Sequence, residues 1–151
     1  MTNWTLKPFS ELTPFELYAI LQLRSEVFVV EQNCVYQDMD NKDLKAVHFM
    51  GWKKEEDGEK LIAHTRLLAP GISYPQPSIG RVVSSPSVRG LGIGRELMER
   101  SIAHIYTLYG RQEIRIGAQL YLKKFYSSLG FIPDGEVYLE DDIEHITMYK
   151  P

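Results

Sequence analysis

The stretch Arg89-Gly90-Leu91-Gly92-Ile93-Gly94 lies between a β-strand pattern and an amphipathic helix pattern. Its three glycines allow backbone torsions that other residues avoid, and they leave no Cβ atom to block a close ligand. The first N–H groups of a helix lack intrahelical acceptors and lie at the positive end of the helix dipole. The stretch therefore predicts a turn whose backbone binds an anion such as phosphate or pyrophosphate.

Two phosphate-binding motifs do not match this turn. A P-loop requires a Lys directly after its last glycine, and Arg95 follows here. A Rossmann fingerprint reads GxGxxG after the first strand of a βαβ unit, whereas this turn reads GxGxG and follows a long antiparallel pattern. A tight turn without a ligand stays open as the alternative, although a plain turn seldom needs three glycines before a helix.

Strand patterns precede the turn, and a helix follows it. The segments Val47–Lys53, Leu61–Leu68 and Ile79–Ser84 have strand character with no helix between them, so we expect them to be antiparallel. After the turn, apolar residues from Leu97 to Leu108 keep helical spacing, and Gly110 ends that helix. The expected elements beyond it are a strand at Ile114–Ala118, a helix over Leu122–Leu129, and strands near Glu136–Glu140 and His145–Tyr149.

The N-terminal part contains the clearest helix start. Thr13-Pro14-Phe15-Glu16 has the pattern of a capping box with proline at the first helical position. Helical spacing continues to Phe28. We expect a weak first strand at Trp4–Phe9, and a short helix or loop over Glu31–Lys45.

This order of elements predicts an α/β fold with a mixed β-sheet and helices on both faces. Residues 79–118 form a strand–helix–strand unit, whose strands should be parallel with a right-handed crossover. With 151 residues, 44% of them hydrophobic, the chain has enough material for one core. We expect a single domain spanning residues 1–151.

Composition argues against several classes of protein. The formal net charge is −3 and the charges are spread along the chain, so nucleic acid is not the expected partner. The single Cys34 forms no intrachain disulfide and belongs to no metal-binding pattern. Neither a signal peptide nor a membrane span is apparent. We expect a cytoplasmic protein, and a homodimer stays open.

The residues just described resemble the GNAT acetyltransferases. Arg89–Gly94 matches the family signature [Q/R]-x-x-G-x-[G/A], and Tyr126-Ser127-Ser128-Leu129-Gly130-Phe131 is similar to its Y-x-x-x-G-F ending. The order of elements agrees over nearly the whole chain. Three further segments, Leu23–Cys34, Gly80–Val82 and Gly117–Gln119, resemble the ElaA-like subgroup.

The resemblance implies acetyl-CoA as cosubstrate and assigns roles to individual residues. The turn would bind the pyrophosphate, through Arg89, Gly90, Leu91, Gly92, Ile93, Gly94 and Arg95. The strand before it would splay from its neighbour, so that the backbone of Val82, Val83 and Ser84 pairs with the pantetheine arm. Gln119 replaces the Asn that many members have beside that arm. Tyr126 is the candidate general acid, since a phenol can protonate a thiolate of similar basicity; helical spacing alone also fits a core residue.

The general base is open among Glu31, His64 and His145, with a water chain or an already neutral amine as alternatives. Arg66 and Arg81 either bind a carboxylate of the acceptor or pair with acids that attach the first helix to the sheet. Cys34 is interpreted as structural. The acids Asp38, Asp40 and Asp43 lack the rest of a calcium loop, so no metal is expected.

The sequence thus predicts an N-acetyltransferase that acts on a primary amine of a small molecule or a protein. Two alternatives stay open. One is a non-catalytic acyl-CoA-binding or interaction module, and the other is an acyltransferase similar to acyl-homoserine-lactone synthases.

Overall fold

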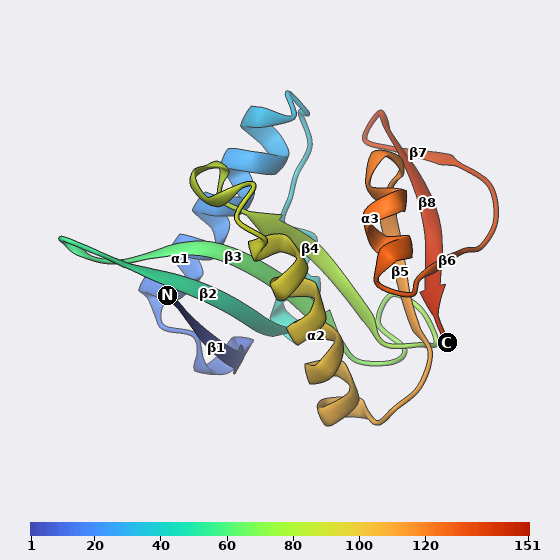
Figure 1. Cartoon of the computed structure of the whole chain (residues 1–151), viewed down its shortest axis with the longest axis horizontal. Coiled ribbons are helices and arrows are strands. Elements are labelled where there is room, and N and C mark those ends of the chain that lie inside the picture. Colours follow the sequence, from blue (N-terminus) through green and yellow to red (C-terminus); the bar gives the residue numbers. More distant parts are fainter.

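Residues 1–151, described here by a computed structural model, form two β-sheets and three main helices (Figure 1). The first sheet is antiparallel throughout and has the strand order β1-β2-β3-β4. Its strands are β1 (Thr2–Pro8), β2 (Val47–Glu55), β3 (Gly58–Leu68) and β4 (Ser78–Ser84). The three antiparallel strands that the sequence predicts upstream of the glycine turn are confirmed.

The second sheet is built around the C-terminal strand β8 (Ile143–Lys150). Strand β5 (Ile114–Gln119) pairs antiparallel with it on one side. The short strands β6 (Ile132–Pro133) and β7 (Tyr138–Glu140) also pair with β8. Strand β6 was not predicted, because two residues carry no alternation pattern.

The prediction of one mixed sheet through a parallel pair at residues 79–118 needs correction. Strands β4 and β5 begin side by side, where the N–H of Arg115 donates to the carbonyl of Pro77 at 3.0 Å. Beyond that point they belong to separate sheets, and Figure 1 shows their ribbons spreading apart. The α/β fold class holds, but β4 keeps an edge without a ladder partner.

The N-terminal helix begins as predicted. In α1 (Pro14–Arg24), the N–H of Glu16 donates to Thr13 Oγ1 at 3.1 Å, and the N–H of Thr13 donates to Glu16 Oε1 at 2.8 Å. The helix does not continue as an α-helix to Phe28, however. It widens into a π-helical segment, η2 (Ser25–Glu31), which directs Glu31 towards the glycine turn.

The other two helices are α2 (Ile93–Tyr109) and α3 (Lys123–Ser128). Gly110 follows α2, and Gly130 follows α3 with a positive φ of 97°, as the sequence predicts for helix ends. Short 3₁₀ turns complete the chain: η1 (Phe9–Glu11), η3 (Lys42–Lys45), η4 (Pro86–Val88) and η5 (Leu120–Leu122).

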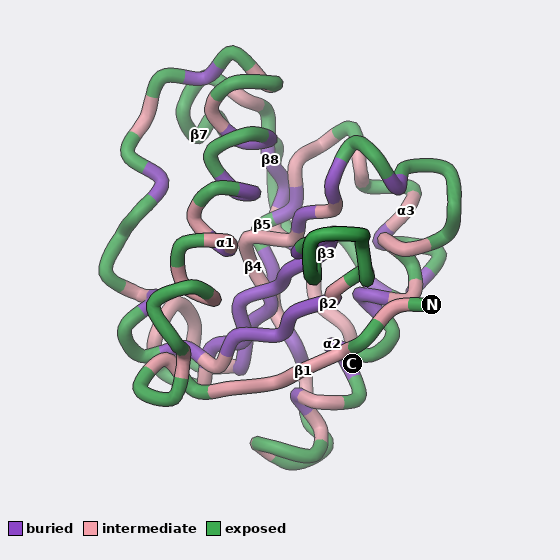
Figure 2. Tube along the Cα trace, turned by 90° about the vertical axis from the view of Figure 1, so that its left-hand side faces the viewer, coloured by how far each residue is buried: buried purple, intermediate pink, exposed green.

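The first sheet buries both of its faces. Met50 of β2 packs with α1 and η2, whereas its neighbour Phe49 packs with Leu97 of α2 on the other face. Figure 2 shows the buried positions running along the strands through the middle of the molecule.

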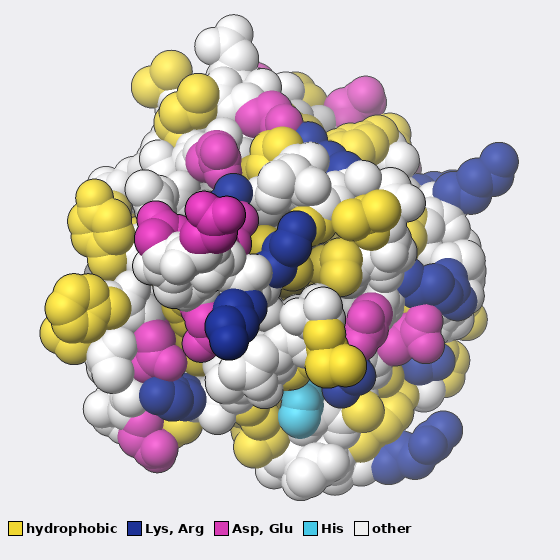
Figure 3. Space-filling view, turned by 60° about the vertical axis from the view of Figure 1, so that its left-hand side comes forward, with side chains coloured by type: hydrophobic (Ala, Val, Ile, Leu, Met, Phe, Trp, Pro, Cys, Tyr) yellow, Lys and Arg dark blue, Asp and Glu magenta, His cyan; other side chains and the backbone are white.

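Acidic and basic side chains are interspersed on the face shown in Figure 3. None of the helices is long and apolar enough to cross a membrane.

Candidate functional site

A cleft of about 900 Å³ opens where β4 and β5 separate. It is lined by η2, β4, the glycine turn, β5, α3 and the β7–β8 hairpin. The structure thus brings together residues from both ends of the chain. The sequence-predicted residues that line it are Glu31, Arg66, Arg81, Val82, Val83, Ser84, Arg89, Gly94, Gln119, Tyr126 and His145.

The glycine turn presents open backbone at one end of this cleft. Gly90 and Gly92 have φ values of 83° and 79°, in the left-handed region that favours glycine. A Cβ atom added at Gly90, Gly92 or Gly94 would meet no atom within 4 Å. These glycines therefore serve the backbone conformation and an open surface, not close packing against the protein.

Five of the seven N–H groups at residues 89–95 lack an acceptor within the protein. Leu91 donates to the carbonyl of Val88 and Glu96 donates to that of Gly92, but no side chain caps α2. Donors without a backbone or side-chain acceptor gather at the start of this long helix, at Gly90, Gly92, Ile93, Gly94 and Arg95. Such a cluster, at the positive end of the helix dipole, fits a phosphate or pyrophosphate group.

Two arginines connect this turn to the elements on either side. Arg89 donates from both terminal nitrogens to the carboxylate of Glu31, at 2.7 and 2.6 Å. The hydrogen bond from Arg89 lowers the pKa of Glu31, so the carboxylate is charged at neutral pH. Arg95 donates to Ser128 Oγ of α3 at 3.0 Å and pairs with Glu99 at 3.0 Å.

Strand β4 bends towards the cleft at a β-bulge. His64 of β3 is opposite Val83 and Arg66 is opposite Gly80, so β4 has one extra residue between these pairs. Arg81 lies in this segment with a φ of 48°, which is uncommon for a residue with a side chain. Because β4 is an edge strand, half of its backbone groups face the cleft without ladder partners.

Tyr126 lies at the bottom of the cleft on α3, between the rings of Phe125 and Phe131. Burial raises the pKa of its phenol well above the ordinary value, with a smaller contribution from Tyr121. The phenol is therefore protonated at neutral pH and can donate. Gln119 of β5 also lines the cleft, where its side chain exchanges hydrogen bonds with Gln32 at 3.2 and 3.4 Å.

His64 does not reach the cleft, contrary to its candidacy as general base. Its side chain is completely buried, and its Nε2 lies 3.0 Å from Nδ1 of His48. His48 Nε2 donates to the carbonyl of Asp43, so His48 Nδ1 accepts from His64. Burial and the nearby His48 hold the pKa of His64 well below its ordinary value. His48 and His64, on the neighbouring strands β2 and β3, thus form a buried pair that belongs to the core.

Arg66 and Arg81 are held by aspartates, which is the structural alternative that the sequence left open. Arg66 donates to both oxygens of Asp40, at 2.7 and 3.0 Å. Arg81 Nε lies 2.8 Å from Asp38 Oδ1. A carboxylate-binding role for these arginines has little support, because their charges are already balanced.

The centre of this network is Arg24, which appears in the sequence only as part of a helical stripe. Its side chain is fully buried and bonds to Asp38 at 2.8 Å and to Asp43 at 2.6 Å. Burial alone would raise the pKa of Asp43, but the hydrogen bond and charge of Arg24 lower it. An arginine on an otherwise apolar helix face, followed by three closely spaced aspartates at positions 38, 40 and 43, was the available signal.

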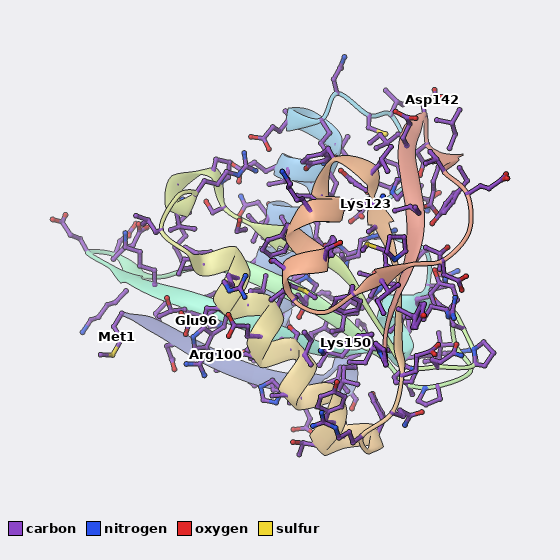
Figure 4. The ribbon with its side chains drawn as sticks, turned by 45° about the vertical axis from the view of Figure 1, so that its right-hand side comes forward. Met1, Glu96, Arg100, Lys123, Asp142 and Lys150 are labelled. Atoms are coloured by element: carbon purple, nitrogen blue, oxygen red, sulfur yellow. The ribbon has the colours of Figure 1, made fainter.

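His145 and two tyrosines form the opposite wall. His145 of β8 is paired in register with Tyr138 of β7 and with Gln119 of β5. Its ring stacks on Tyr138 at a centroid distance of 5.7 Å. A Cβ added at Gly117 would lie 2.9 Å from Tyr138 Oη and 3.3 Å from Tyr74 Oη, so this glycine gives the phenols room. Figure 4 shows Asp142 at the tip of the adjoining β7–β8 turn.

Cys34 also lines the cleft, and its Sγ lies 3.3 Å from the carbonyl of Asp141. Burial raises the pKa of its thiol, with smaller contributions from Asp141 and Asp142. A protonated, buried thiol is a poor nucleophile. This agrees with the interpretation of Cys34 as structural.

Comparison with known proteins identifies the family. Residues 21–151 match the Acetyltransferase (GNAT) domain. The chain belongs to the GNAT acetyltransferase family. It is 43% identical to the protein ElaA of Escherichia coli, over 99% of this chain and 97% of that protein, which supports the ElaA-like subgroup. Members of the family use an acyl-CoA.

Solved structures agree with this membership. An acyl-CoA N-acyltransferase from Pseudomonas aeruginosa superposes with a TM-score of 0.92 at 44% identity, covering 100% of both chains. The crystal structure of Escherichia coli ElaA gives a TM-score of 0.90 at 42% identity, again over 100% of both chains. The AHL synthase LasI has a TM-score of 0.75 over 99% of this chain and 89% of its own, but at 13% identity it shows a common fold alone.

Proposed function

We propose that the protein transfers the acetyl group of acetyl-CoA to a primary amine. The observation that carries this proposal is the group of N–H donors without a protein acceptor, at Gly90 and at residues 92–95. These donors and the two flanking arginines suit the pyrophosphate of the cosubstrate. The free edge of β4 at Val82, Val83 and Ser84 suits the amide groups of its pantetheine arm.

The cosubstrate supplies an activated acyl group, and the residues of the chain orient it and move protons. The N–H of Val82 is the candidate donor to the thioester oxygen, where negative charge develops. Tyr126 is the candidate general acid. Burial keeps its phenol protonated at neutral pH, so the Oη–H group can donate to the departing sulfur as negative charge develops on it. The apolar rings of Phe125 and Phe131 around Tyr126 exclude water from this end.

The test is release of CoA thiol from acetyl-CoA, measured with a panel of primary amines for the wild type and Tyr126→Phe. We expect amine-dependent release from the wild type and a decrease in kcat of roughly 10²-fold or more in the variant. Phe125→Leu is a control that removes a neighbouring ring and leaves the phenol in place. Tight binding of acetyl-CoA without thiol release for any amine would favour the non-catalytic module. Turnover like the wild type in Tyr126→Phe would remove the acid role from this residue.

Four statements from the sequence stay predictions. They are the single domain over residues 1–151, the cytoplasmic location, the homodimer and the absence of a metal.

The identity of the acyl group has its own test in the same assay. Acetyl-CoA should give a higher kcat/KM than longer acyl-CoA thioesters. A preference for a longer acyl chain would retain the acyltransferase family and overturn the acetyl specificity.

A further inference from the structure

We infer that His145 is the general base, and that the acceptor enters as an ammonium ion beside His145, along the wall of the cleft to which Tyr74 and Tyr138 contribute. This inference rests on the proposed function and specifies the acceptor side of the same cleft. Among the three candidate bases that the sequence offers, His64 is buried and does not line the cleft. Glu31 lies against Arg89 at the glycine turn, the end of the cleft that we assign to the pyrophosphate. His145 alone of the three lines the cleft on the side of the β7–β8 hairpin.

The hydrogen bonds of His145 determine which nitrogen can act. Nδ1 lies 2.7 Å from the carbonyl of Ile143. A carbonyl oxygen only accepts, so Nδ1 carries the proton and the neutral ring has its lone pair on Nε2. The ring is further fixed by stacking on Tyr138, in register with it on the neighbouring strand. The base is thus oriented before any acceptor arrives.

A path for the proton leads from Nε2 to solvent. Glu140 Oε2 lies 3.6 Å from His145 Nε2, and the Glu140 side chain is 62% exposed while that of His145 is 10% exposed. At this distance the carboxylate stabilises the charged imidazolium through its charge, and solvent around the exposed Glu140 side chain takes up the proton.

The groups around His145 favour a cation. They include the rings of Tyr74 and Tyr138, the carboxylates of Glu140 and Asp141, and the thiol of Cys34, all lining the cleft. Burial raises the pKa of Tyr138, and Glu140 adds to that shift; burial, Tyr138 and Glu140 raise that of Tyr74. Both phenols therefore stay neutral. Aromatic faces beside carboxylates bind ammonium groups, and an acceptor bound in that form needs a base.

The proton balance closes with two residues. His145 Nε2 takes one proton from the acceptor nitrogen and releases it to solvent. The nitrogen forms a C–N bond to the thioester carbon while the C–S bond breaks, and Tyr126 donates its proton to the sulfur. The second nitrogen proton returns to the Tyr126 phenolate through water. The products are an acetamide, the CoA thiol and one proton.

The experiment compares wild type with His145→Asn across pH and across two kinds of acceptor. Asn keeps a donor for the carbonyl of Ile143 and lacks the basic nitrogen. With primary alkylamines at neutral pH, kcat/KM should fall by roughly 10²-fold or more, and it should recover as rising pH deprotonates the amine in solution. Hydrazides arrive neutral at pH 7, so their rates should change far less. A purely structural role would lower both rates together.

His104→Asn is the matched control, since His104 lies on α2 against Phe49 and does not line the cleft. The thermal shift that acetyl-CoA causes verifies that each variant folds and binds. Should His145→Asn fail that check, Glu140→Gln at an exposed position replaces it, with a smaller decrease and the same recovery with pH. An unchanged rate and pH profile in the folded variant overturns the base assignment and leaves the acetyltransferase intact. Absence of turnover in the wild type with every amine and hydrazide overturns both.

Discussion

The glycine turn at residues 89–95 and the arginine–aspartate network around Arg24 border the same cleft. They differ in whether their polar groups have partners within the protein. In the network, the charges of Arg24, Arg66 and Arg81 are balanced by Asp38, Asp40 and Asp43. In the turn, N–H donors have no acceptor in the protein. Arginines are the residues most suggestive of an anion site, yet here they hold the fold together. The proposed anion site rests instead on N–H groups for which the protein supplies no acceptor.

The largest effect that separates the two regions is expected from Asp43→Ala. This change leaves the fully buried Arg24 without one of its two carboxylate partners. Removing one member of a buried ion pair typically costs about 3–5 kcal/mol, and we expect that loss in the free energy of unfolding measured with urea. Glu99→Ala, in an exposed pair with Arg95, should cost at most about 1 kcal/mol. Equal losses in the two variants would contradict a structural role for the network.

The second effect concerns the turn. Gly92→Glu places a carboxylate beside the free N–H donors, so acetyl-CoA should no longer raise the melting temperature. At a ligand concentration of 100 times Kd, the free energy of unfolding of the wild type increases by about 2.7 kcal/mol, and the variant should lose this increase. Gly58→Glu is the matched control, because Gly58 also has a positive φ of 124° and open space around its Cβ position, but lies at the start of β3. A retained thermal shift in Gly92→Glu would argue against an anion site at this turn.

The third effect is a dependence of the free energy of unfolding on pH. It arises from the arginine–aspartate network and from the buried His48 and His64. Burial lowers the pKa of both His48 and His64, so they stay neutral in the folded protein. Below the ordinary histidine pKa of about 6.5, the unfolded chain binds protons that the folded protein does not. Stability should therefore fall as pH decreases from 7 to 5, by up to about 1.4 kcal/mol per pH unit for each histidine.

Urea denaturation of the wild type at several pH values measures this slope. The lowered pKa of Asp43 adds a second loss at lower pH, because its ion pair stabilises above the ordinary aspartate pKa and disappears as pH falls through the folded value. A flat stability between pH 7 and 5 would mean that the histidines take up protons in the folded state.

The smallest effect is expected from Glu31→Gln, at the contact between η2 and the turn. Both partners of the Glu31–Arg89 pair are substantially exposed, and Arg89 has to leave Glu31 before it contacts a phosphate. Acetyl-CoA should bind roughly two- to fivefold more tightly to the variant, measured by calorimetry. Arg89→Gln should change affinity in the opposite direction. Weaker binding to Glu31→Gln would indicate that Glu31 positions the arginine for its ligand.

The parts of the fold that depend on neighbouring residues could be predicted from the sequence. The capping box at Thr13–Glu16, the antiparallel strands β2 to β4 and the ends of α2 and α3 all appear as expected. Each depends on local hydrogen bonds, side-chain alternation or a positive φ, which a short window of sequence contains. The glycine turn could be located in the same way, because its open conformation follows from its composition.

The base of the proposed reaction could not be predicted from local patterns. Glu31, His64 and His145 had no order of preference in the sequence, since a histidine carries the same chemistry in a core and in a cleft. Their ranking follows from contacts between distant segments: Glu31 with Arg89, His64 with His48, and His145 with strands on both sides.

The sequence by itself determined the family, the order of the main elements and the position of the glycine turn, because these are properties of contiguous segments. Only the tertiary structure decided that β4 and β5 separate into two sheets, that α1 widens into η2, and that the arginines are neutralised by aspartates. The pairing of the arginines depends on groups far apart in the chain: Arg24 and Asp43 are 19 residues apart, and Arg66 and Asp40 are 26. A buried charge must find its partner wherever the fold places one, and no local pattern specifies that partner.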